Sequence, residues 1–241
     1  MHWNIKDTPL QETTAHLIEC LGVDAVVAQL LAQRGITTFE EARAFFRPHI
    51  GQLHDPFLMQ DMDKAVGRLQ QAIDQKEAVM VYGDYDVDGT TSVSLLTHFL
   101  RSQGLDVTPY IPDRYAEGYG LSKKGIDTAK AANISLMIAL DCGVKAIEQV
   151  AYAKTLGIEL IICDHHTPAD VLPDALAVLD PKRGDCTYPF KELCGCGVGF
   201  KLMQGLLQQQ GKEVNEIIAY LDFVAVAIAA DIVPMVGENR A

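Results

Sequence analysis

From residue 78 onward, short apolar runs alternate with longer stretches in which apolar residues recur at helical spacing. Each apolar run has the usual length of a buried strand. Because strands and helices alternate, we predict an α/β fold: an open, mostly parallel five-stranded sheet with helices on both faces. The expected strands are 78–82, 105–111, 134–140, 158–163 and 176–179, and helices are expected after Gly89 and at about 122–132, 144–156, 198–210 and 215–230.

Residues 1–75 differ from the rest of the chain because they show helical patterns without strands between them. Thr38 and Glu41 have the spacing of a capping box at the start of one helix. A further amphipathic stretch leads into the first strand. We therefore predict two parts: a helical amino-terminal segment over 1–75, which carries no evident chemistry, and an α/β domain over 76–241.

Composition and charge narrow the class of protein. At 241 residues and 49% hydrophobic content, the chain can bury a full core. It has no long apolar run and no basic, apolar leader, so we expect a soluble cytoplasmic protein with no membrane partner. Its six cysteines show no zinc-type pairing with histidines, which suits a reducing compartment. The net charge of −12 argues against a broad nucleic-acid-binding face but leaves a metal-dependent phosphodiesterase open, because metals supply local positive charge.

Three aspartates alternate directly after the first predicted strand: Asp84, Asp86 and Asp88. Carboxylates this close repel one another and raise each other's pKa, so a site that keeps them together usually holds a cation. A solvated acidic turn is the simpler interpretation of the cluster by itself. An EF-hand calcium loop has the same opening spacing, but its twelfth position needs a glutamate and is Leu95 here.

Two other predicted strands also end in residues that can bind metals. Asp141 follows the third strand, and Asp164, His165 and His166 follow the fourth. Taken singly, Asp141 can cap a helix and either histidine can be an ordinary turn residue. The carboxyl ends of parallel strands share one edge, however, so we expect these side chains to meet there. Carboxylates with imidazoles and no thiolate suit Mn²⁺ or Mg²⁺, and the number of ligands suits two ions.

The loop over residues 112–122 offers contacts to a substrate, because it follows the second strand at the same edge of the sheet. Arg114 can bind a phosphate there, and Tyr115 or Tyr119 can stack on a base. An ion pair between Arg114 and Glu117 within a surface loop is the structural alternative.

A second glycine-containing stretch, Gly195-x-Gly197-x-Gly199, comes just before a predicted helix. Its backbone N–H groups, that of Gly197 in particular, can bind a phosphate at the helix start. The spacing is not that of a dinucleotide fingerprint, and the lysine of a P-loop is absent. Close packing of the helix on a strand explains the glycines almost as well.

Four short motifs resemble those of the DHH phosphoesterase superfamily: GDYDVDG at 83–89, LDCG at 140–143, DHH at 164–166 and AADIVP at 229–234. Neighbouring stretches resemble, more narrowly, the RecJ family of bacterial exonucleases specific for single-stranded DNA. These stretches are PDRYAEGYGLS at 112–122, LCGCGVGFKL at 193–202 and GENR at 237–240. The resemblance extends from residue 78 to the end of the sequence, and its motifs are highly specific.

The resemblance implies a two-metal site. The implied ligands are Asp84, Asp86, Asp88, Asp141, His165 and Asp231, with Asp141 bridging the two ions. Beside Asp141 and His165, His166 is implied as a catalytic residue that faces the scissile phosphate, and Asp164 as a residue that orients the histidines. Asp231 enters the set only through the resemblance, because in the sequence it is a polar residue near a helix end.

The resemblance also implies an enzyme: a metal-dependent exonuclease that degrades single-stranded DNA from 5′ to 3′. Two-metal activation of water would release nucleoside 5′-monophosphates, in DNA repair and recombination. The alternatives are another DHH phosphodiesterase, acting on oligoribonucleotides or cyclic dinucleotides, a manganese pyrophosphatase and, least favoured, a non-catalytic scaffold at replication forks.

RecJ-type proteins continue beyond the GENR motif into domains that contact DNA. We therefore expect single-stranded DNA, those carboxy-terminal domains and a helicase or single-strand-binding protein as partners. Without those domains, we expect this chain to bind metal but to degrade DNA poorly.

Overall fold

The computed structural model describes residues 6–241, which form two compact units. One unit contains the residues up to Gln52 together with Arg240 and Ala241, and the other runs from Leu53 to Asn239. The boundary predicted at residue 75 rests on the helical, strand-free pattern of residues 1–75 and not on compactness, and it stays a prediction. No helix in residues 6–241 combines the length and the apolar content that crossing a membrane requires.

The smaller unit is helical, as the sequence predicted. Thr38 accepts a hydrogen bond from the Glu41 N–H, and the Glu41 side chain accepts one from the Thr38 N–H, which confirms the capping box. The helices enclose a small core of Leu17, Ala28, Leu31, Ile36 and Ala42. They are α1 (Gln11–Leu21), α2 (Ala25–Ala32) and α3 (Phe39–Phe46), followed by a 3-10 turn over Ile50–Gln52.

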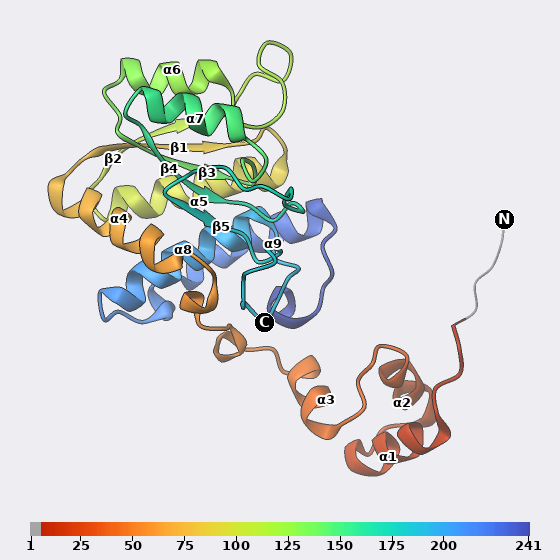
Figure 1. The fold of residues 1–241 in the computed structure, drawn as a ribbon. Coiled ribbons are helices and arrows are strands. Elements are labelled where there is room, and N and C mark those ends of the chain that lie inside the picture. The colour runs from red at the N-terminus through yellow and green to blue at the C-terminus, as the bar shows by residue number, and fades with distance from the viewer. Residues whose placement is uncertain (1–5) are drawn as a thin grey trace. The chain divides into compact units, whose positions relative to one another are not determined.

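The larger unit contains a five-stranded parallel sheet in the order β2-β1-β3-β4-β5, as predicted (Figure 1). Its strands are β1 (Ala78–Gly83), β2 (Asp106–Tyr110), β3 (Leu136–Leu140), β4 (Glu159–Cys163) and β5 (Ala177–Leu179). From β1 the chain crosses to β2 at the edge and then returns to β3 on the other side of β1. The loops that follow β1 and β3 therefore diverge, and ligands of open parallel sheets usually bind at such a point.

Helices cover both faces of this sheet, which also confirms the prediction (Figure 1). On one face lie α4 (Met62–Gln75), α5 (Val87–Ser102), α8 (Gly195–Gln209) and α9 (Leu221–Asp231). On the other lie α6 (Lys123–Ala131) and α7 (Ile147–Thr155). The predicted helix over 215–230 is partly a 3-10 helix, over Val214–Tyr220, and becomes α-helical only at α9.

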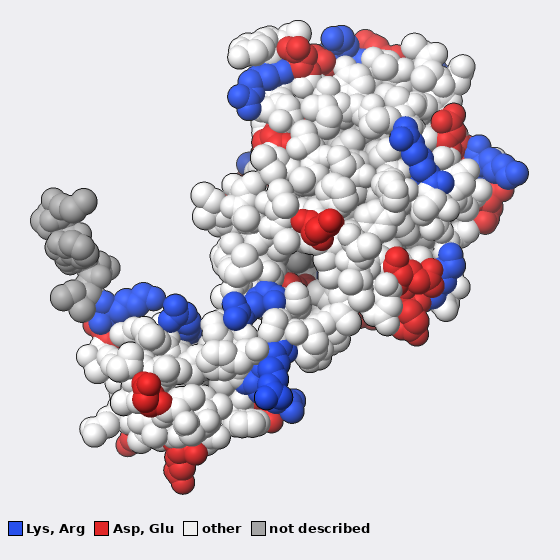
Figure 2. Space-filling model, turned by 180° about the vertical axis from the view of Figure 1, so that it is seen from behind, with Lys and Arg blue, Asp and Glu red and all other residues white. Residues whose placement is uncertain are grey.

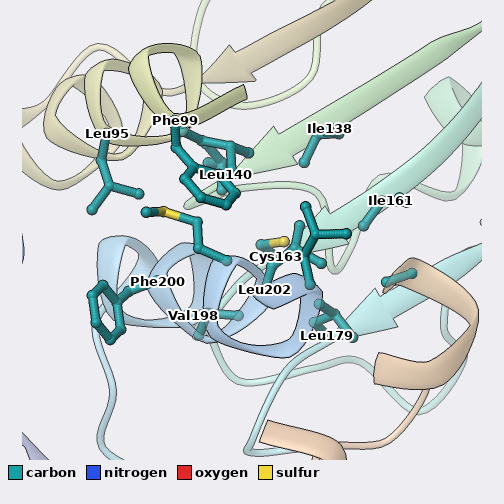
Figure 3. Close-up of a cluster of buried hydrophobic side chains, with 14 of the residues drawn as sticks. Leu95, Phe99, Ile138, Leu140, Ile161, Cys163, Leu179, Val198, Phe200 and Leu202 are labelled. Carbon is teal, nitrogen blue, oxygen red and sulfur yellow. The ribbon is translucent and has the colours of Figure 1, made fainter. Parts of the chain in front are cut away.

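Alternate residues of each strand enter the two cores. On β3, Ile138 and Leu140 face the α5 and α8 side, and Leu140 lies beside Phe99 (Figure 3). Ala139 faces the α6 and α7 side. Because the sheet is buried on both faces, its strands read as continuous apolar runs. This arrangement makes the sheet rigid and holds the polar residues that follow each strand at one edge.

Charged side chains are interspersed over the face of the larger unit that Figure 2 shows, and acidic and basic residues alternate there among uncharged ones. The described residues on that face thus form no broad basic surface. This agrees with the acidic net charge of −12.

Candidate metal centre

The three alternating aspartates leave β1 in one tight turn. A Cβ atom at Gly89 would lie 2.4 Å from the carbonyl oxygen of Asp84, so only glycine lets α5 begin this close to the strand. Asp86 caps α5 and accepts a hydrogen bond of 2.8 Å from the Gly89 N–H. Asp84 and Asp88 are buried, whereas Asp86 is exposed. The turn therefore points its carboxylates in different directions.

The start of α8 holds the Asp88 carboxylate. Its two oxygens accept hydrogen bonds from the N–H groups of Gly195, at 2.6 Å, and Cys196, at 2.7 Å. Burial raises the pKa of Asp88, and these hydrogen bonds oppose that shift. The N–H of Gly197, which the sequence suggested for a substrate phosphate, donates instead to Cys194 Sγ at 3.3 Å. Its role in substrate binding stays a prediction.

His165 lies at the centre of a group of carboxylates. Its Nε2 atom is 3.1 Å from Asp141 Oδ1, 3.6 Å from Asp231 Oδ2 and 3.7 Å from Asp88 Oδ2. The Asp141 N–H donates to the Cys163 carbonyl across the strand ends, and a left-handed φ of 58° turns its side chain inward. Donor atoms roughly 3 Å apart are typical of neighbouring ligands around one cation with bonds near 2.1 Å.

Two overlapping groups of ligand-type atoms result. Asp88, His165 and Asp231 form one, and Asp141, His165 and His166 form the other; within each group the atoms lie within 4.8 Å of one another. We call these five residues the ligand cluster. Asp84 and Asp86, which the resemblance also implied as ligands, belong to neither group. The structure thus brings together four of the six implied ligands and adds His166.

Several buried polar atoms in and beside the ligand cluster lack partners. Both carboxylate oxygens of Asp84 and of Asp141, and both ring nitrogens of His165, make no hydrogen bond within residues 6–241. Burial, together with the charges of Asp88 and Asp86, raises the pKa of Asp141 to about 10. Burial likewise raises the pKa of Asp84. Unpaired buried groups of this kind are costly, and a divalent cation would satisfy them.

His166 is oriented by Asp164. Asp164 Oδ1 lies 2.7 Å from His166 Nδ1 and accepts hydrogen bonds from the N–H groups of both histidines, while Oδ2 accepts one from Val144. The hydrogen bond that Asp164 Oδ1 accepts from the His166 ring raises the pKa of His166. His166 Nε2 points the other way, 3.1 Å from the hydroxyl of Tyr119. Asp164 therefore has the geometry of an orienting residue.

The loop over 112–122 is held in place by Glu117. Burial alone would raise the pKa of Glu117. Hydrogen bonds from Ser122, the Asp113 N–H and Tyr110 outweigh burial, so the pKa falls to about 2. Glu117 pairs with Lys124 and not with the arginine that the sequence offered as its partner. That arginine and two tyrosines are left exposed on the loop. Arg114 stacks on the Tyr85 ring at 4.3 Å, Tyr119 lies edge-on to the same ring, and Tyr115 is 95% exposed.

Asp180 is a buried carboxylate that the sequence reasoning missed. It follows β5 directly, so it lies at the same edge of the sheet, and its Oδ2 atom is buried without a partner. Burial raises its pKa to about 6, with Asp164 adding to the shift. The signal in the sequence is the same as at the other strand ends, because Asp180 directly follows the predicted strand over 176–179.

The fold and the ligand cluster define a class: an α/β protein with a metal-binding type of site at the carboxyl edge of a parallel sheet. The family model described as DHH family, N-terminal domain, matches residues 78–228. The chain therefore belongs to the DHH family.

The relatives it matches include several RecJ proteins. The single-stranded-DNA-specific exonuclease RecJ of Bacillus subtilis is 43% identical over 240 residues, which are 100% of this chain and 30% of that protein. RecJ of Escherichia coli is 33% identical over 225 residues, which are 89% of this chain and 38% of that protein. The chain thus spans about a third of the length of these relatives.

A solved structure of RecJ from Thermus thermophilus in complex with Mn²⁺ has a TM-score of 0.81 at 28% identity, covering 97% of this chain and 32% of that one. Another, of exonuclease RecJ bound to manganese, has a TM-score of 0.70 at 32% identity, covering 80% of this chain and 47% of that one. The observed fold is therefore similar to that of the matched part of RecJ.

Proposed function

We propose that this chain is the metal-binding domain of a RecJ-type exonuclease, which degrades single-stranded DNA from 5′ to 3′ in the cytoplasm during DNA repair and recombination. The observation that carries the proposal is the pair of overlapping ligand groups that share His165. The names of the relatives support the substrate, and the manganese-bound structures support the cofactor.

The ligand cluster fits two divalent ions, Mn²⁺ or Mg²⁺. Asp88, His165 and Asp231 would hold one ion, and Asp141 would serve the other and bridge the two. Asp84 and Asp86 belong to neither group of ligand-type atoms and remain candidate ligands. When bound, such ions lower the pKa of water and neutralise charge that develops on a phosphoryl group.

The residues around the cluster would position the DNA. Asp164 fixes the His166 ring, so that Nε2 faces the space beside Tyr119. Because Asp164 holds Nδ1, His166 Nε2 is placed to donate a hydrogen bond to a phosphate oxygen. Arg114 would bind a phosphate, and Tyr115, which is 95% exposed, would stack on a base.

The release of nucleoside 5′-monophosphates by a RecJ-type enzyme would also need the parts of such proteins that this chain does not span. The chain has a net charge of −12, so affinity for the DNA backbone would come mainly from those parts. A helicase or a single-strand-binding protein is a further candidate partner. We therefore expect metal binding by this chain with weak nuclease activity.

Calorimetric titration with Mn²⁺ tests the proposal. The parent chain should bind two ions, and Asp141→Ala should weaken at least one of them by a factor of about 100, because it removes a buried ligand. Asp106→Ala is the matched control, since Asp106 is exposed at the opposite edge of the sheet. A folded parent that binds neither Mn²⁺ nor Mg²⁺ would contradict the proposal. A 5′-labelled single-stranded oligonucleotide then measures the residual nuclease activity.

A further inference from the structure

A cavity of about 250 Å³ opens beside His166, on the side of the sheet that α6 and α7 cover. The loop after β3, the start of α7 and the end of the 112–122 loop form its walls. None of these segments contributes to the Asp88 group of the ligand cluster. The cavity is lined by Tyr119, Gly120, Leu121, Cys142, Gly143, Val144, Lys145, Ala146, Gln149, Asp164 and His166.

The walls of the cavity are mostly apolar. Leu121, Cys142 and Val144 are buried and offer carbon and sulfur surface, and Gly143 adds none of its own. A Cβ atom at Gly143 would contact Leu121 Cδ1 at 3.2 Å, and its φ of 111° favours glycine, so the backbone forms part of the wall. Apolar surface combined with a few polar groups is typical of sites for small organic ligands.

Three side chains, those of Gln149, Tyr119 and Lys145, add polar groups to the cavity wall. Gln149 contributes a carboxamide that can both donate and accept hydrogen bonds, as the edge of a nucleobase requires. Tyr119 brings an aromatic ring and a hydroxyl 3.1 Å from His166 Nε2. Lys145 is exposed and contributes the cation of the lining.

We propose that this cavity binds the nucleobase of the nucleotide whose phosphodiester is cut. The inference rests on the proposed function and names the part of the substrate that the site holds. His166 belongs both to the cavity wall and to the ligand cluster, so a base in the cavity leaves its phosphate beside His166. With a volume of about 250 Å³, the cavity is smaller than the ~300–1,000 Å³ of drug-sized sites, which suits one base and not two.

Ala146 and Ala151 provide a matched pair of variants on the same helix. Ala146 caps α7 and lines the cavity, so Ala146→Leu would fill it. Ala151 is exposed in the middle of α7, so Ala151→Leu adds the same atoms outside the cavity. Gln149→Ala, at a partly exposed position, removes the carboxamide without adding bulk.

The probes are dTMP, which has a base, and 2-deoxyribose 5-phosphate, which has none, both titrated by NMR in the presence of Mg²⁺. In the parent and in Ala151→Leu, dTMP should bind at least five times more tightly than 2-deoxyribose 5-phosphate does. This preference for dTMP should come with shifts of the amide signals of Gly143 and Gln149. Ala146→Leu should abolish this preference and leave the affinity for deoxyribose 5-phosphate unchanged. Gln149→Ala should reduce the preference about threefold.

Equal affinity of the parent for both probes would overturn the base site, and so would a preference that survives Ala146→Leu. Mg²⁺ binding, measured in the same samples, tests the metal centre separately. Thymidine, which has no phosphate and needs no metal, should shift the Gly143 and Gln149 signals in the parent only if the cavity binds the base. A failure of the metal centre would therefore leave the test of the cavity intact.

Discussion

The two edges of the sheet differ in how their buried charged side chains are paired: those at the amino ends of the strands have partners, and several at the carboxyl ends have none among the described residues. At the amino edge, Arg68 of α4 donates hydrogen bonds to Glu77, at 2.7 Å, and to Glu159, at 2.6 Å, and Ser135 donates to Glu77 at 2.8 Å. At the carboxyl edge, the buried carboxylates and imidazole in and beside the ligand cluster have oxygens and nitrogens without partners. Both edges belong to the same sheet, so the contrast comes from the side chains near the start and the end of each strand.

The pKa shifts differ between the edges in the same way. Burial alone would lower the pKa of Arg68, but its two glutamates raise it, and Arg68 in turn lowers the pKa of Glu77. At the carboxyl edge the pKa of Asp141 rises to about 10, because burial and its carboxylate neighbours act together. Paired charges at one edge support the fold, whereas unpaired charges at the other reduce stability until a cation binds.

Gly195→Ala should have the largest effect, and it acts at the carboxyl edge only. A Cβ atom at Gly195 would lie 2.6 Å from Asp141 Cβ and 2.7 Å from its Oδ1, so Asp141 must move out of the ligand cluster. We expect Mn²⁺ affinity to fall about 100-fold, as for loss of the support that positions a ligand. Calorimetric titration with Mn²⁺ measures this change.

Gly67→Ala is the control for that variant, because a Cβ atom there meets nothing within 4 Å. Gly67 lies on the exposed side of α4, so alanine should stabilise the protein by about 0.5–1 kcal/mol and leave Mn²⁺ affinity unchanged. If Gly195→Ala bound Mn²⁺ as tightly as Gly67→Ala, the close approach of α8 to Asp141 would not matter for the site.

The difference between the edges also explains what the sequence could predict. The apolar runs predicted all five strands because both faces of the sheet are buried, and the strand ends then predicted that Asp88, Asp141 and His165 meet. Contacts between distant segments left no such pattern. The hydrogen bonds from Gly195 and Cys196 to Asp88 join residues more than 100 positions apart. These hydrogen bonds depend on how α8 packs, and the spacing of residues along the sequence does not predict that packing.

Asp231 shows the same limit from another side. It lies at the end of α9 and not after a strand, so the rule for parallel sheets could not select it, and only the resemblance did. In the structure it comes within 3.6 Å of His165 because α9 packs along α5. The amino edge was equally hidden, since Arg68, Glu77 and Glu159 read as ordinary surface charges in the sequence.

Arg68→Met should show that the amino edge serves stability alone. The change leaves Glu77 and Glu159 without their partner, and because Glu159 is half exposed we expect a loss of about 2 kcal/mol in the free energy of unfolding. Urea denaturation measures it. Lys154→Met, which breaks an exposed ion pair with Asp174, should cost less than about 0.5 kcal/mol. A change of more than twofold in Mn²⁺ affinity for Arg68→Met would mean that the two edges are coupled.

Metal binding at the carboxyl edge should also release about one proton. Because the pKa of Asp141 is raised from 3.8 to about 10 in the folded chain, the metal-free fold keeps a proton that the unfolded chain loses. The stability that the protonated Asp141 contributes to the fold is fully present below about pH 4 and is lost as the pH rises towards 10. Mn²⁺ must displace this proton, so Mn²⁺ affinity should increase by up to tenfold per pH unit between pH 7 and 9.

Calorimetry in two buffers of different ionisation enthalpy counts the protons released on Mn²⁺ binding. Asp141→Asn, which keeps the histidines, should release about one proton fewer than the parent. Equal proton release by the parent and Asp141→Asn would show that Asp141 is already ionised at the metal-free edge.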